Sequence, residues 1–173
     1  ELGKKRFAET LGDKNADGEY LHNKDTSGEG GGAAVNCDPH GWPRIHTYNY
    51  GFEFVRLPDR VIQFFEWGAT HRTIWTDGRQ LPNPEDIDEP RWMGYTVGRW
   101  DGDTFVVESV GHDERTWIDH FGYPHSDAMR LEERWKRTGY DTLELNMTIT
   151  DPKIYTRPWK GQTKRFKFFP KES

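Results

Sequence analysis

The chain has little cysteine, few aliphatic residues and no excess of basic residues. Its single cysteine, Cys37, excludes an intrachain disulfide and a cysteine-cluster metal site. Hydrophobic residues make up 33% of the 173 residues. No apolar run approaches the roughly 20 residues that span a bilayer as a helix. The net charge of −5 argues against nonspecific nucleic-acid binding. The length is still sufficient for one domain with a real core.

The chain is instead rich in aromatic residues, and apolar and polar residues alternate regularly along parts of it. Aromatics reach 14% of the residues, which suits a sheet protein with a core of large rings. Apolar side chains alternate with polar ones over 142–150, so we expect a half-buried strand with Leu145 fully buried. Asp101-Gly102 is a strong turn signal and predicts a tight hairpin. Similar patterns predict strands over 46–57, 60–67, 70–76, 92–100, 104–110, 129–137, 142–150, 154–157 and 163–169.

Sequential strands with almost no helix predict an all-β fold. Short connections favour an antiparallel meander, and closure removes its sheet edges. We therefore expect an antiparallel up-and-down, lipocalin-like β-barrel over 37–173, with a β-sandwich as the alternative. Residues 1–36 are expected to form a short helix (2–11) and a Gly-rich extended arm that joins copies into a homo-oligomer. The chain begins at Glu1 rather than Met, so we expect a processed, periplasmic or extracellular protein without its signal peptide.

Several phrases carry a resemblance to an uncharacterised family of small, often secreted bacterial β-rich proteins. They are CDPHGWPR (37–44), TDGR (76–79), WMGYTVGRWDGDTFVVESVG (92–111), ERTWID (114–119), PHSDAMRLEERW (124–135) and DTLELNMTITDPKIYTRPW (141–159). Together they cover most of the chain after residue 36. The resemblance implies export and a β-rich fold, and it brings no activity with it.

The connection 111–133 holds the densest set of titratable groups. His125 follows Pro124, which restricts the local backbone, and Asp119 lies six residues upstream. A carboxylate beside an imidazole is the arrangement of acid–base catalysis, so His125 and Asp119 are the candidate catalytic pair. The remaining candidates are Arg115 and Asp113 as catalytic groups and Trp117 as a stacking surface for a sugar or aromatic ligand. The alternative is a solvated loop whose charges pair locally.

Two polar residues interrupt otherwise apolar strand faces. Gln63 shares a face with Phe65, and Glu133 shares one with Trp135. A buried acid is costly unless it is paired or lines a wet cavity. Glu133 is therefore either in an ion pair with Arg72, Arg99 or Arg134, or a polar anchor in a ligand cavity. The candidate ligand contacts are Gln63, Glu133, Trp92 and Trp117.

These observations favour a barrel that binds a small organic or carbohydrate ligand. One form of this function is a cofactor-independent acid–base enzyme that uses His125 and Asp119, such as a lyase, isomerase or hydrolase. A noncatalytic ligand carrier and an extracellular assembly subunit, joined through residues 1–36, are the alternatives. No nucleic-acid partner, membrane span or cofactor is predicted. The seven histidines show no HxH or HExxH spacing, so no metal site is predicted, although convergence across the barrel stays open.

Overall fold

Strands dominate the computed structural model, which describes residues 39–119 and 122–169. The strands are β1 (Phe52–Arg56), β2 (Arg60–Phe65), β3 (Thr70–Trp75), β4 (Tyr95–Asp101), β5 (Thr104–Val110), β6 (Arg130–Gly139), β7 (Thr142–Thr150), β8 (Trp159–Lys160) and β9 (Lys164–Lys167). Short 3-10 helices are η1 (Arg44–Thr47), η2 (Trp67–Ala69) and η3 (Pro84–Asp86). The all-β prediction is confirmed. The expected N-terminal helix and arm lie outside the described residues.

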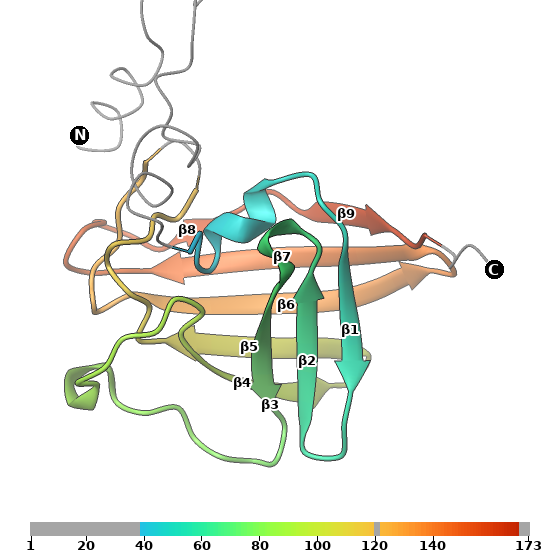
Figure 1. Cartoon of the computed structure of the whole chain (residues 1–173), viewed down its shortest axis with the longest axis horizontal. Helices are drawn as coiled ribbons and strands as arrows, with labels where there is room; N and C mark the ends of the chain where they lie inside the picture. The colour runs from blue at the N-terminus through green and yellow to red at the C-terminus, as the bar shows by residue number, and fades with distance from the viewer. Residues whose placement is uncertain (1–38, 120–121, 170–173) are drawn as a thin grey trace, which may run out of the picture.

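The strands form a single, strongly curled sheet that makes a half-barrel (Figure 1). Its order is β1 to β8 in sequence, and β9 also pairs with β7. Neighbours are antiparallel except at β3 and β4, which run parallel and meet at one residue pair, Trp75 and Val97. The long, proline-rich connection over 76–94 joins the two strands, so that the last residue of β3 pairs near the start of β4. This junction differs from the uniform meander expected from the sequence.

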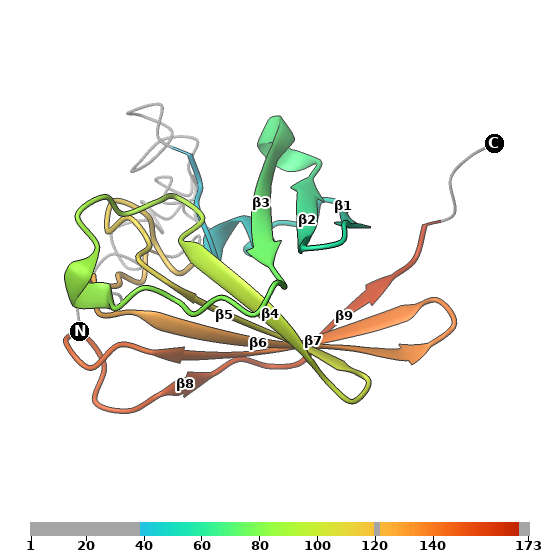
Figure 2. The ribbon, with the colours of Figure 1, turned by 90° about the horizontal axis from the view of Figure 1, so that it is seen from below.

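Figure 2 shows the curl of the sheet from below, and ring contacts rather than strand pairing connect β1 to β9 across the open side of the half-barrel. Phe52 on β1 packs edge-on against Phe166 on β9, with ring centroids 4.9 Å apart. Both rings also lie against Trp135 on β6, at 5.6 and 5.8 Å. Among the described strand pairings no ladder joins β1 to β9. The two edges of the sheet therefore approach through aromatic side chains, and the sheet does not close by hydrogen bonds.

Local sequence explains where several strands begin and end. Gly102 adopts a φ of +61° in the β4–β5 turn, a conformation that glycine tolerates without strain. The predicted strand over 46–57 starts late, because its first residues belong to η1. The predicted strand over 154–157 is wrong. The backbone amides of Ile154 and Tyr155 bond to the carbonyl of Asp151 at 3.2 and 2.8 Å, which makes a turn, and pairing resumes in β8.

The core lies on the concave face of the sheet. It is built mainly from aromatic and branched side chains, together with two methionines: Trp42, Ile45, Val61, Phe65, Ile74, Phe105, Val107, Met129, Leu131, Trp135, Leu145, Met147 and Ile149. Leu145 is 1% exposed, which confirms the burial predicted from the alternation in β7. No helix in the described ranges is long and apolar enough to cross a membrane.

Candidate ligand-binding cleft

A cleft of about 760 Å³ lies against the core-facing side of β7. Its lining is mainly apolar and aromatic: Pro43, Thr47, Ile118, Asp119, Tyr123, Met147, Ile149, Tyr155, Trp159 and Lys164. Three of these residues, Thr47, Asp119 and Lys164, bring polar groups other than a phenol. The volume and this mixture match small-molecule pockets, which measure roughly 300–1,000 Å³ and place a few polar groups on an apolar wall.

The walls of the cleft are positioned by ordinary strand and turn geometry. Met147 and Ile149 point the same way because side chains alternate along β7. Trp159 on β8 lies directly across from Ile149 in the sheet register. The opposite wall comes from the connection between β5 and β6, where the amide of Ile118 donates to the carbonyl of Tyr123 at 2.9 Å. The cleft thus joins the sheet to the connection that the sequence singled out.

Tyr155 links the β5–β6 connection to the segment between β7 and β8 by a hydrogen bond. The Tyr155 hydroxyl donates a hydrogen bond of 2.7 Å to the carbonyl of Pro124. Tyr155 also lines the cleft and is partly buried. Its ring is therefore held in place by its own hydroxyl, and a ligand that contacts the ring meets a surface that is already ordered.

Lys164 on β9 brings an amine to this mostly apolar wall. Its Nζ donates a hydrogen bond of 2.8 Å to the carbonyl of His46, in η1. Burial lowers the pKa of the Lys164 amine from its usual value, because an ammonium loses hydration in the cleft. Among the described residues that line the cleft, Lys164 has the only amine. The structure therefore supplies a fixed, partly desolvated cation or nucleophile.

Asp119 reaches the cleft, whereas His125 has other contacts. The Asp119 carboxylate accepts from the amide of Tyr123 at 3.3 Å. His125 is buried, with Nε2 2.8 Å from the Thr116 hydroxyl and Nδ1 3.2 Å from the carbonyl of Ser126. Both ring nitrogens of His125 therefore lie against groups other than Asp119. Acid–base chemistry by this pair stays a prediction, and these contacts do not favour it.

A second histidine is buried beside His125. The His112 ring stands edge-on to the His125 ring at 6.2 Å, and burial lowers the pKa of His112 to about 3. Burial also lowers the pKa of His125, although the charges of Asp151, Glu114 and Asp113 act in the opposite direction. Both rings are therefore neutral near pH 7. No group of three potential metal ligands forms within residues 39–119 and 122–169.

The other candidates from the connection pair locally. Arg115 donates to both carboxylate oxygens of Asp113, at 2.9 and 2.6 Å, and holds the pKa of Asp113 below its usual range. The Arg115 guanidinium also lies over the Trp92 ring at 4.3 Å. Trp117 is covered by the guanidinium of Arg44 at 4.8 Å. These contacts match the local-pairing alternative, and none of these residues lines the cleft.

Glu133 and Gln63 meet in one buried network around Arg72. Arg72 donates to both carboxylate oxygens of Glu133 at 2.7 Å and to the Gln63 side-chain carbonyl at 2.8 Å. The Trp135 indole N–H also donates to Glu133, at 2.8 Å. The Trp42 ring stacks beneath the guanidinium at 3.5 Å. Glu133 therefore forms a buried ion pair, which was one of the two alternatives predicted from the sequence, and its partner is Arg72.

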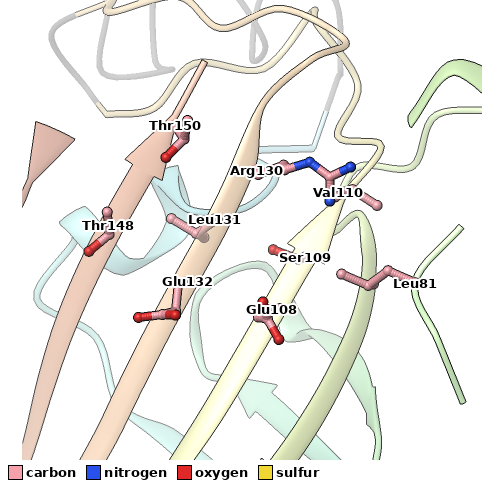
Figure 3. A pocket seen from close by; sticks show the side chains of 9 residues that line it. All are labelled: Leu81, Glu108, Ser109, Val110, Arg130, Leu131, Glu132, Thr148 and Thr150. Carbon is pink, nitrogen blue, oxygen red and sulfur yellow. The ribbon is translucent and has the colours of Figure 1, made fainter. Parts of the chain in front are cut away.

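A smaller hollow of about 280 Å³ lies beside β5, β6 and β7 (Figure 3). Glu108 and Glu132 stand directly opposite each other there, on adjacent antiparallel strands. Opposed like charges destabilise a sheet, but Arg99 makes an ion pair with Glu108. The volume is below that of typical ligand pockets. This hollow is therefore a weaker candidate than the cleft.

Sequence reasoning overlooked most of the residues that line the cleft. Lys164 shares a strand face with Phe166, which packs against the core. A lysine on a core-facing strand face could have been recognised as a candidate site residue. Tyr155 lay in the run 154–157, which was misread as a strand, and Trp159 lay just beyond that run. Their convergence depends on the turn after Asp151, which the alternation pattern did not reveal.

No family model, curated protein or solved structure matches this chain. The resemblance of its sequence phrases to an uncharacterised family therefore stays a prediction.

Proposed function

We propose that the protein binds a small, mainly apolar organic molecule with an aromatic portion in the cleft beside β7. The observation that carries this proposal is the cleft itself, with its volume of about 760 Å³ and its aromatic walls. The half-barrel then acts as a container comparable to a lipocalin-like barrel. Lys164 and Asp119 provide the polar groups that orient the ligand.

The chemistry of the walls favours an organic ligand over a carbohydrate. A sugar presents many hydroxyl groups, each of which loses free energy if it is buried without a hydrogen bond. Met147, Ile149, Ile118 and Pro43 provide no side-chain partner for them. An aromatic molecule can instead stack on Trp159, a cleft residue that is 51% exposed.

Titration with 1-anilinonaphthalene-8-sulfonate, an aromatic probe with a single anionic group, tests this proposal. We expect one saturable site per chain, with enhanced probe fluorescence. Trp159→Ala should weaken binding roughly 2- to 10-fold, because an aromatic contact contributes about 0.5–1.5 kcal/mol. The matched control is Trp100→Ala, since Trp100 is also exposed, at 59%, but lies on β4 away from the cleft.

Equal loss of probe affinity in both variants would contradict the proposal, as would wild-type binding that never saturates. Thermal unfolding of each variant shows whether it remains folded. A variant that unfolds at the wild-type temperature reports on the cleft alone.

A further inference from the structure

We propose that Lys164 forms a reversible imine with small apolar aldehydes that enter the cleft. The inference rests on the proposed binding function and names the chemical class of ligand. It also assigns to the site a covalent step that simple binding does not require.

The position of the amine supports this step. Lys164 lines the cleft with Met147 and Trp159, so a carbonyl compound held by these apolar walls lies beside an amine. The bond from Nζ to the carbonyl of His46 fixes the otherwise flexible side chain at 2.8 Å. Fixing a nucleophile beside a bound partner replaces a bimolecular encounter with an intramolecular one, which accelerates the reaction.

The electrostatic environment supplies the reactive form. An ammonium cannot attack a carbonyl, because its nitrogen lone pair is already bonded to a proton. Burial lowers the pKa of Lys164, so more of the amine is neutral than for a lysine in water. Desolvation of a lysine in an apolar pocket is a recognised route to an amine that forms Schiff bases.

The reaction balances without a cofactor. The Nζ lone pair attacks the carbonyl carbon, a C–N bond forms, and the carbonyl oxygen takes up a proton to give a carbinolamine. Loss of that oxygen as water, with the remaining amine proton, leaves the C=N double bond of the imine. One amine and one aldehyde thus give one imine and one water, with no change in the overall redox state.

Lys160 provides a matched control for nonspecific reaction of the aldehyde with exposed amines. Lys160 on β8 is exposed and lies across from Thr148 on β7, only a few residues from Lys164 in sequence. It does not line the cleft. An aldehyde that reacts with any accessible amine will modify Lys160, whereas one captured by the cleft will modify Lys164. The location of the adduct therefore separates the two mechanisms.

The test uses the full chain, 2-naphthaldehyde at low concentration and sodium cyanoborohydride to trap any imine as a stable amine. Intact-mass spectrometry and peptide mapping then locate the adduct. We expect one adduct per chain on Lys164, its loss in Lys164→Arg and its retention in Lys160→Arg. Mapping on wild-type protein keeps the test valid even if Lys164→Arg fails to fold. An adduct spread over exposed lysines, or unchanged in a folded Lys164→Arg variant, overturns the inference.

A parallel competition distinguishes failure of the imine step from failure of the binding site. The alcohol 2-naphthalenemethanol has the same ring system but cannot form an imine. If it displaces anilinonaphthalene sulfonate while Lys164 is not preferentially trapped, the imine inference is wrong and the cleft still binds. If neither the alcohol nor the aldehyde displaces the probe, the proposed binding function fails as well.

Discussion

Arg72 on β3 and Glu133 on β6 are joined by two hydrogen bonds of 2.7 Å, and both side chains are almost completely buried. The two strands belong to different wings of the sheet, β1–β3 and β4–β9, and within the described residues the only strand pairing between these wings is Trp75–Val97. The ion pair therefore ties these wings together across the core. Its hydrogen bonds offset the desolvation of both charges, which is otherwise costly.

Removing one member of this pair should strongly destabilise the fold. Glu133→Leu leaves the Arg72 charge buried without its partner, so we expect it to lower the free energy of unfolding by about 3–5 kcal/mol. Replacing both residues, as Arg72→Met with Glu133→Leu, should recover much of that loss because no charge stays buried. Chemical denaturation measures all three values.

The exposed pair between Arg99 and Glu108 is the control for this experiment. Its side chains are 58% and 39% exposed, and such surface pairs contribute about 0–1 kcal/mol. Glu108→Leu should therefore change stability little. Similar losses for Glu133→Leu and Glu108→Leu would show that the buried pair does not hold the wings together.

The inward face of β7 gives a second stability prediction. Leu145 is 1% exposed, and Leu145→Ala should cost about 2–5 kcal/mol through lost burial and a residual cavity. Leu57, in the β1–β2 turn, is 38% exposed, so the same substitution there should cost no more than about 0.5–1 kcal/mol. Equal midpoint shifts in urea would rule out the assigned core.

The fold class and much of the strand order follow from sequence alone. The alternation over β7 and the Asp101-Gly102 turn are local signals, and local backbone preferences determine both. The parallel contact between β3 and β4 is different. It depends on where a long, proline-rich connection returns, which involves tertiary packing that no local pattern encodes. Over the described strands, the sheet curls without closing through backbone hydrogen bonds. Its two edges meet through the ring contact between Phe52 and Phe166, which is likewise a tertiary contact.

The candidate site was harder to predict than the fold. Asp119 was named as a candidate and reaches the cleft, while His125 and Arg115 were named and have other contacts. Close spacing in a loop does not determine which way each side chain turns. Lys164 and Trp159 lie far along the chain from Asp119, so only the folded sheet brings them together.

Buried His112 should make stability depend on pH. Its pKa is about 3 in the folded protein against about 6.5 in an unfolded chain, so folding favours the neutral ring. This contribution is complete above about pH 6.5 and is lost as the pH falls towards 3. Between pH 6.5 and 5, wild type should lose about 1.6 kcal/mol relative to His112→Leu. A stability difference that stays constant over this range would contradict the assignment.

The charges around His125 give a prediction that NMR titration can check. Burial lowers the pKa of His125, and the negative charges of Asp151, Glu114 and Asp113 offset only part of this effect. Glu114 is exposed, so Glu114→Gln can be made without disturbing the core. It should lower the pKa of His125, since loss of a nearby negative charge disfavours imidazolium. An unchanged pKa of His125 in Glu114→Gln would contradict this assignment.

Locating a heavy-atom ligand in a crystal tests ligand binding by the cleft most directly. Crystals grown with 4-bromobenzyl alcohol, diffracted at the bromine absorption edge, report the position of the bromine without reference to any variant. We expect an anomalous peak within about 4 Å of the side chains of Trp159 and Met147, the distance of van der Waals contact. A peak only in the hollow beside Glu108 and Glu132, or no peak from a saturating concentration, would contradict ligand binding by the cleft.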